Sequence, residues 1–269
     1  MAYCEMKVRG SNSLGRMNAF TALVPEGVPG PFPVLYLLHG YSDDHTGWVR
    51  RSNVERYAER YPMIIIMPDG QHGWYTDAAS MPYAKFETHL ADELVGFVDT
   101  TFSTIADRRG RAIAGLSMGG YGALKLAVKH PDKFCAGHSF SGAVGITMRD
   151  NTLSTMMGAE PETPWSIEQR LIFGETPTGG PEDLRALILA ANKKTMPAIS
   201  FDCGVDDFLY DSNQSFHAFL TEKKIPHIYE QFPGAHDWDY WDTHIQEVLA
   251  RMAKHFGIKK IGEAEAEKE

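Results

Sequence analysis

Cysteine is scarce in this chain. Only three of the 269 residues are cysteines, namely Cys4, Cys135 and Cys203, and no two of them lie close together in sequence. Neither a disulfide framework nor a cysteine-based zinc site is therefore expected. The three thiols are better explained as small, mostly buried apolar side chains than as a redox centre.

A positive charge balance and long hydrophobic runs are also missing. The chain has 26 Lys and Arg against 35 Asp and Glu, a formal net charge of −9. A nucleic-acid partner is not expected, because binding phosphates requires a basic surface. The segment Met1–Lys7 lacks the apolar core of a signal peptide, and no run reaches the ~18 apolar residues that can cross a membrane. These absences predict a cytoplasmic protein without a membrane partner.

The remaining composition is typical of a globular protein. Hydrophobic residues make up 43% of the chain and charged residues 23%, which allows a sizeable core. There is no internal repeat and no linker-like stretch, so we expect a single domain over residues 1–269. The charged residues 262–269 are expected to form a frayed tail.

Short apolar runs alternate with helical patterns along the chain. Strands are predicted at 33–38, 63–67, 112–116, 135–141, 198–203 and 228–232, and helices at 86–102, 120–130, 212–223 and 242–256. This alternation predicts an α/β fold with a mostly parallel central sheet and helices on both faces. Residues 142–190 are too long for an ordinary connection and are predicted to form a small excursion near the strand ends. Ligands of such folds bind beyond the carboxyl ends of the strands.

The sequence Gly115-Leu-Ser-Met-Gly119 lies between a predicted strand and a predicted helix. In a nucleophile elbow, a serine occupies a strained strand-to-helix turn, and the flanking glycines allow the close approach of strand and helix. The helix N-terminus also favours negative charge that develops at the hydroxyl. We therefore predict Ser117 to be the nucleophile of a serine hydrolase.

His39-Gly40-Tyr41 directly follows the first strong strand. Acyl transfer needs two N–H donors aimed at the oxyanion. In hydrolases with a nucleophile elbow, one donor follows the nucleophile and the other lies in the loop after an early strand. The backbone amides of Met118 and Tyr41 fit these two positions, and His39 is expected to shape the loop.

A serine nucleophile needs a base and a carboxylate that orients the base. Of the eleven histidines, His236 follows the last predicted strand in a turn-rich loop. This position agrees with the chain order serine, acid, histidine. The acid should follow the strand at 198–203, where Asp206 and Asp207 are adjacent. Spacing leaves the choice between these two residues open.

Several aromatic residues lie near the predicted strand ends and could line an apolar substrate cleft. They are Trp48, Trp74, Tyr75, Trp238 and Trp241. Ordinary packing explains any one of them equally well. Trp48 and Trp74 are the two that we predict to contact substrate.

The ordered motifs resemble those of the tributyrin-esterase and S-formylglutathione-hydrolase-like α/β-hydrolases, within the esterase D lineage. The resemblance covers nearly the whole chain and is carried by Leu37–Gly40, Asn53–Arg56, Gly73–Asp77, Gly115–Gly122, Cys203–Tyr210 and Gly234–Trp238. It is weaker over about the first thirty residues and in the 142–190 excursion.

This resemblance implies an α/β-hydrolase fold and a serine esterase that hydrolyses short acyl esters without a cofactor or metal. It also implies that Asp207 is the catalytic acid, because in the family motif this aspartate directly precedes Phe-Leu. Relatives include S-formylglutathione hydrolases and esterases that act on acetylated sugars or feruloyl esters, which are the alternative activities. Because relatives form oligomers, a dimer or tetramer is a further expectation.

Overall fold

All eight strands form one sheet in the computed structural model, which describes residues 1–8, 12–148, 152–157, 160 and 162–262. The sheet order is β1-β2-β4-β3-β5-β6-β7-β8. The strands are β1 (Ala2–Val8), β2 (Asn18–Val24), β3 (Val34–Leu38), β4 (Ile64–Pro68), β5 (Arg111–Leu116), β6 (Ala136–Phe140), β7 (Ala198–Gly204) and β8 (Ile228–Phe232). The last six are the strands predicted from the apolar runs, with ends that differ by one residue at most.

β1 and β2, which make the antiparallel part of the sheet, are not among the strands predicted from the sequence. β1 pairs with β2, and β2 with β4, in antiparallel fashion, whereas β3 to β8 are parallel to their neighbours. β1 lies at the sheet edge and alternates between half-buried and exposed residues along most of its length. It therefore lacks the continuous apolar run by which a strand covered on both faces is recognised.

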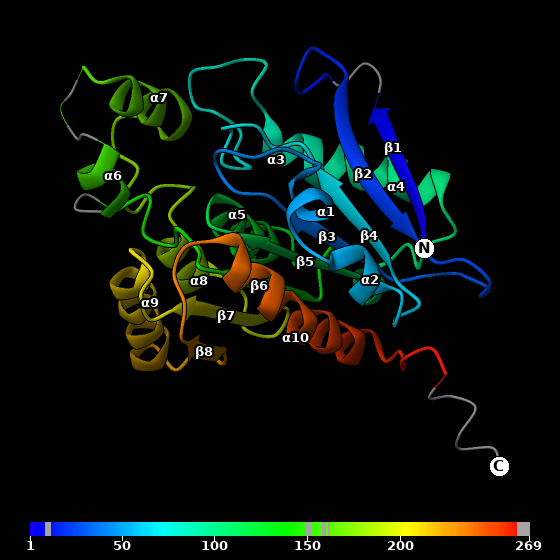
Figure 1. Ribbon diagram of the computed structural model, residues 1–269. Coiled ribbons are helices and arrows are strands. Elements are labelled where there is room, and N and C mark those ends of the chain that lie inside the picture. The colour runs from blue at the N-terminus through cyan, green and yellow to red at the C-terminus, as the bar shows by residue number, and fades with distance from the viewer. Residues whose placement is uncertain (9–11, 149–151, 158–159, 161, 263–269) are drawn as a thin grey trace.

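Helices cover both faces of the sheet (Figure 1). The helical elements are α1 (Gly47–Arg51), α2 (Val54–Ala58), α3 (Phe86–Thr88), the π-helix η1 (His89–Leu94), α4 (Val95–Thr101), the 3-10 helix η2 (Arg108–Gly110), α5 (Met118–Lys129), α6 (Thr152–Met157), α7 (Pro164–Phe173), α8 (Leu184–Ala190), α9 (Tyr210–Glu222) and α10 (Trp238–Phe256). The predicted helix at 86–102 is the continuous run from α3 through η1 to α4. The 142–190 excursion contains α6, α7 and α8, and α6 and α7 stand apart from the sheet at the upper left of Figure 1.

The core is divided in two by the sheet. On β3, Val34 and Tyr36 belong to one apolar cluster, whereas Leu35 and Leu37 belong to the other. The first cluster continues into α4, α5, α8 and α9, and the second continues into α1, α2 and α10. Successive residues of β3 and of β4 thus point alternately to the two clusters, and both clusters are buried. This is why both strands are continuously apolar in sequence.

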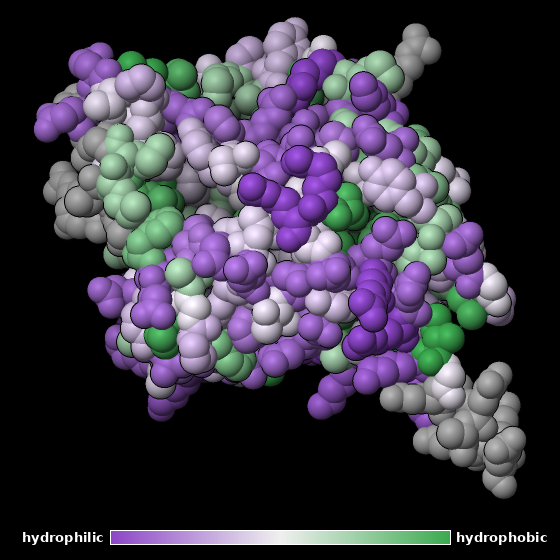
Figure 2. Space-filling model, in the orientation of Figure 1, coloured by the Kyte–Doolittle hydropathy of each residue, from purple (hydrophilic) through white to green (hydrophobic). Residues whose placement is uncertain are grey.

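Polar residues dominate the visible surface. Figure 2 shows hydrophilic side chains over most of this face, with apolar residues in small separate groups. Within the described residues, no helix has both the length and the apolar character that crossing a membrane requires. The predicted frayed tail falls almost entirely on residues 263–269, which lie outside the described part of the chain.

Candidate active site

Ser117 occupies a strained turn between β5 and α5. Its backbone has φ 54° and ψ −114°, a conformation that L-residues rarely adopt. The turn is held by hydrogen bonds from the Ser117 N–H to the Phe140 carbonyl at 2.9 Å and from the Ala143 N–H to the Ser117 carbonyl at 3.1 Å. β5 and α5 approach so closely that a Cβ atom on Gly115 would lie 2.5 Å from the Gly119 carbonyl oxygen. These features are those of a nucleophile elbow.

His236 and Asp207 come from the loops after β8 and β7 and converge on Ser117. The His236 Nε2 atom lies 3.0 Å from the Ser117 Oγ, and its Nδ1 lies 2.8 Å from the Asp207 Oδ2. A carboxylate can only accept, so the Nδ1 proton points to Asp207 and Nε2 is free to accept the serine proton. The three side chains are therefore arranged as a Ser-His-Asp triad.

The geometry distinguishes Asp207 from its neighbour Asp206. The Asp207 side chain is fully buried, and its Oδ1 accepts a hydrogen bond from the Leu209 N–H at 2.7 Å. Asp206 is exposed, and its backbone N–H donates to the Gly234 carbonyl at 3.0 Å. Only Asp207 is in contact with His236, which agrees with the choice that the family motif implies.

The loop after β3 lies directly against the elbow. A Cβ atom on Gly40 would lie 3.6 Å from the Ser117 Cβ. Among the described residues, neither the Tyr41 nor the Met118 backbone amide has a hydrogen-bond acceptor, so both are available to an oxyanion. His39 is buried, and its Nε2 accepts a hydrogen bond from the Gly70 N–H at 2.8 Å. It thus joins this loop to the loop after β4, as expected for a residue that shapes the loop.

A pocket of about 390 Å³ opens onto Ser117 and His236, and we call it the catalytic pocket. Its walls come from the loops after β3, β5, β7 and β8, from α1 and α10, and from the 142–190 excursion. The lining residues are Gly40, Tyr41, Ser42, Asp43, Arg51, Leu116, Ser117, Leu153, Phe208, His236, Asp237, Trp238 and Trp241.

The two tryptophans predicted to contact substrate do not line this pocket. Trp48 and Trp74 are each 1% exposed. Trp48 donates to the Leu38 carbonyl at 3.1 Å and packs beneath Trp238, while Trp74 packs against Tyr121 and Phe173. Both are core residues here, because strand-end positions in this fold can point under the loops as well as into the cleft.

The aromatic wall is instead made by Phe208, Trp238 and Trp241. The Phe208 ring centroid lies 4.4 Å from that of His236, and the Trp241 ring is edge-on to the His236 ring at 5.0 Å. Phe208 could have been suspected from sequence, because it directly follows Asp207, the predicted catalytic acid. Trp238 and Trp241 are among the aromatic residues near the predicted strand ends, but the sequence did not distinguish them as substrate contacts.

The parallel sheet with its nucleophile elbow, and the serine, histidine and aspartate at the strand ends, define the class as an α/β-hydrolase of the serine-hydrolase type. A family model described as "Putative esterase" matches residues 11–252. The chain belongs to this esterase family and is a carboxylic ester hydrolase.

Known relatives agree with this assignment. An acetyl esterase of Caldicellulosiruptor saccharolyticus is 30% identical over 224 residues, which cover 82% of this chain and 83% of the relative. Among solved structures, the fluorophosphonate-binding serine hydrolase F of Staphylococcus aureus has 28% identity and a TM-score of 0.81, covering 93% of this chain and 98% of that chain. An S-formylglutathione hydrolase of the same organism has 29% identity and a TM-score of 0.79, and the match covers 93% of this chain and 98% of that chain.

Proposed function

We propose that the enzyme hydrolyses esters of short acyl groups through an acyl-enzyme intermediate on Ser117. The observation that carries this proposal is the position of His236, 3.0 Å from the Ser117 Oγ and 2.8 Å from the Asp207 carboxylate. Similarity to an acetyl esterase supports the short acyl group.

In the first half of the reaction, His236 accepts the Ser117 proton while the Oγ atom attacks the ester carbonyl carbon. Negative charge moves to the carbonyl oxygen, which binds the Tyr41 and Met118 amides. Asp207 holds the imidazole in position and stabilises its charged form. As the bond to the alcohol breaks, His236 donates the proton to the leaving oxygen and the acyl group stays on Ser117.

In the second half, a water molecule takes the place of the alcohol. His236 accepts a proton from this water as its oxygen attacks the acyl carbon. The bond from the acyl carbon to the Ser117 Oγ then breaks, and the serine regains its proton from His236. The carboxylic acid leaves, and the resting enzyme is restored without a cofactor.

The test is turnover of p-nitrophenyl acetate and butyrate by wild type and by Ser117→Ala. Loss of a nucleophile that works together with a base is expected to reduce kcat by about 10⁶-fold. An organophosphonate should label the wild-type chain at Ser117 and leave the variant unlabelled. Full activity of Ser117→Ala, or labelling elsewhere, would refute the assignment.

A second candidate activity is hydrolysis of S-formylglutathione, a thioester, by the same triad. It is favoured by similarity to the S-formylglutathione hydrolase of Staphylococcus aureus. The ratio of kcat/KM for S-formylglutathione to that for p-nitrophenyl acetate separates the two. A ratio far above one assigns the thioester, and a ratio far below one assigns oxygen esters such as tributyrin, acetylated sugars or feruloyl esters.

We also propose a cytoplasmic location and a homo-oligomer of two or four chains. Cell fractionation and sedimentation of the purified protein test them separately.

A further inference from the structure

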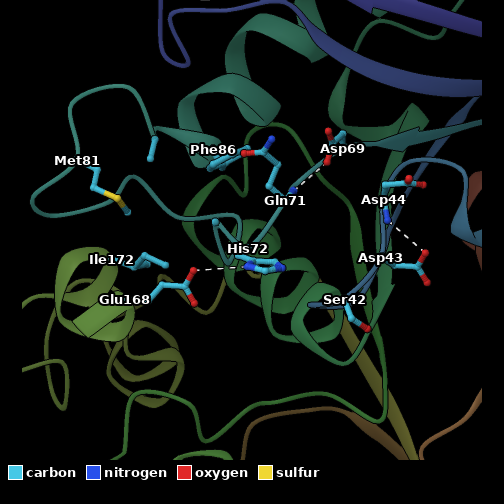
Figure 3. Close-up of a pocket in the computed structure, with 12 residues that line it drawn as sticks. Ser42, Asp43, Asp44, Asp69, Gln71, His72, Met81, Phe86, Glu168 and Ile172 are labelled. Carbon is cyan, nitrogen blue, oxygen red and sulfur yellow. Dashed lines mark hydrogen bonds and ion pairs between the residues drawn. The ribbon is translucent and has the colours of Figure 1, made fainter. Parts of the chain in front are cut away.

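A second and larger pocket adjoins the catalytic pocket. Figure 3 shows the residues that line it. It has a volume of about 580 Å³, and we call it the side pocket. The two pockets share Ser42 and Asp43 in the loop after β3. Part of the side-pocket wall is apolar, formed by Met81, Ala84, Phe86 and Ile172.

Tyr41 connects the walls of the two pockets. It lines the catalytic pocket, whereas two residues that its side chain contacts, His72 and Glu168, line the side pocket. The Tyr41 ring stacks on the His72 ring with 4.0 Å between the centroids. Its hydroxyl donates a short hydrogen bond to the Glu168 carboxylate.

Two further contacts hold the Tyr41 ring in this place. Trp165 meets it edge-on at 5.5 Å between centroids, and His72 is itself 3.5 Å from the Glu168 carboxylate. Burial and the hydrogen bond to Glu168 both raise the pKa of the Tyr41 phenol, so it stays protonated and continues to donate. Trp165 and Glu168 both belong to α7. This helix of the excursion therefore holds the side chain of Tyr41, while the backbone amide of Tyr41 is a proposed oxyanion donor.

The acyl side of the catalytic pocket follows from the mechanism. His236 must reach the leaving oxygen to protonate it, so the alcohol lies on the side of His236. There the ring is surrounded by Phe208 and Trp241. Tyr41 packs with a different aromatic group, formed by His72, Trp74 and Trp165. The acyl chain, which points away from the alcohol, therefore extends toward Tyr41.

We propose that the Tyr41 side chain sets the acyl-length limit of the enzyme by separating the catalytic pocket from the side pocket. With the ring in place, a short acyl group fills the available space. With the ring removed, the two pockets join, and a medium-length acyl chain can pack against the apolar wall of the side pocket. This inference rests on the proposed esterase activity and adds a residue that determines its specificity.

The experiment compares kcat/KM for p-nitrophenyl octanoate and p-nitrophenyl acetate, which share one leaving group. Tyr41→Ala keeps the backbone amide and removes the ring. The octanoate-to-acetate ratio is expected to rise by about tenfold or more, because adding or excluding even one methylene changes kcat/KM by about that factor. Tyr41→Phe keeps the ring and should leave the ratio within about twofold of wild type.

Two further variants and one control test whether the longer acyl chain enters the side pocket and whether Glu168 holds the Tyr41 ring. Ala84→Phe fills the side pocket, so the double variant Tyr41→Ala/Ala84→Phe should lose most of the gain on octanoate. Glu168→Ala removes the partner of the Tyr41 hydroxyl and the partner of the His72 ring together. It therefore loosens the Tyr41 ring more than Tyr41→Phe does, and should raise the ratio by more than about twofold but by less than Tyr41→Ala does. Glu162→Ala is its matched control, since Glu162 is close in sequence, 88% exposed and outside both pockets.

The inference is overturned if folded Tyr41→Ala turns over acetate with an unchanged ratio, or if Ala84→Phe does not reverse the gain. If Tyr41→Ala does not fold, Tyr41→Leu replaces it, because leucine is apolar and shorter than tyrosine. The octanoate-to-acetate ratio is then judged in the same way. Absence of turnover on every ester by wild type would instead remove the proposed function itself.

Discussion

At the scale of single residues, the two adjacent aspartates after β7 show that local geometry decides which of them contacts His236. Asp207 is buried and contacts His236, while Asp206 points to the exterior one residue away. Their side chains are identical, so a difference between them in activity can come only from position. They provide a matched pair of substitutions.

Asp207→Asn should reduce kcat by about 10⁴-fold, because an amide in place of the carboxylate favours the wrong imidazole tautomer. Asp206→Asn should stay within about twofold of wild type, since its carboxylate is solvated. The measurement is p-nitrophenyl acetate turnover by both variants at neutral pH. Equal losses in the two variants would contradict the assigned role of Asp207.

At the scale of elements, the contact of β5, α5 and the loop after β3 positions Ser117, the proposed nucleophile. Gly119 lies in the first turn of α5, where a Cβ atom would come within 2.6 and 2.7 Å of the His39 and Leu38 carbonyl oxygens. These are backbone atoms that cannot move without shifting β3 and its loop. Gly96, in α4, has no atom within 4 Å of the corresponding position.

Alanine substitutions at these two helical glycines should therefore have opposite effects. Gly96→Ala should raise the free energy of unfolding by about 0.5–1 kcal/mol, because alanine loses less backbone entropy in a helix. Gly119→Ala should lower it by about 1–3 kcal/mol through overpacking, and should also reduce kcat by moving the oxyanion loop. Urea unfolding and ester turnover measure the two effects, and a stabilised, fully active Gly119→Ala would disprove the close-packing argument.

At the scale of the whole molecule, a buried group of charges joins three distant segments. Lys125 of α5 is fully buried and contacts Glu87 of α3 at 2.9 Å and Glu182, just before α8, at 2.7 Å. Lys129 contacts the same two carboxylates, and His130 contacts Glu87 at 3.0 Å. The network thus anchors the end of the excursion to the helix that follows the nucleophile.

Burial alone would raise the pKa of the Glu87 carboxyl, but the Lys125 charge and the hydrogen bonds from His130 and Lys129 hold this pKa far below its usual value of 4.5. A carboxyl with a depressed pKa stabilises the fold above its unfolded-state pKa, and the contribution is lost as the pH falls. The stabilising effect of Glu87 is thus complete at neutral pH and declines below about pH 4.5.

Glu87→Gln should therefore lower the free energy of unfolding at pH 7 by about 3 kcal/mol, the typical cost of breaking a buried ion pair. The difference from wild type should shrink as the pH falls below about 4.5. Glu222→Gln removes a carboxylate from an exposed pair with Lys223 and should leave the free energy of unfolding essentially unchanged, because exposed ion pairs contribute little. A pH-independent difference for Glu87→Gln would show that packing, not charge, accounts for the loss.

The strands and the elbow were predictable because their signals are local. β3 and β4 are continuously apolar since both faces are covered, and the serine turn is recognised from glycines within two residues of Ser117. β1 was missed because a half-buried edge strand carries a weaker apolar pattern. β2 is mostly buried, but the polar residues Asn18 and Thr21 interrupt its apolar run. The helices α1 and α2 were missed as well, since each spans only five residues and so offers too short a periodic pattern.

The sequence by itself determined the α/β architecture, the serine turn and the order of serine, acid and histidine, because each depends on residues that are neighbours in the chain. Tertiary structure decided what depends on residues far apart. It brought Asp207 rather than Asp206 to His236, put Trp48 and Trp74 in the core, and packed the Tyr41 ring against Trp165 and Glu168 of α7. Each of these contacts joins loops that follow different strands, or a loop and a helix of the excursion. No single segment of the sequence shows which of its residues will make such a contact.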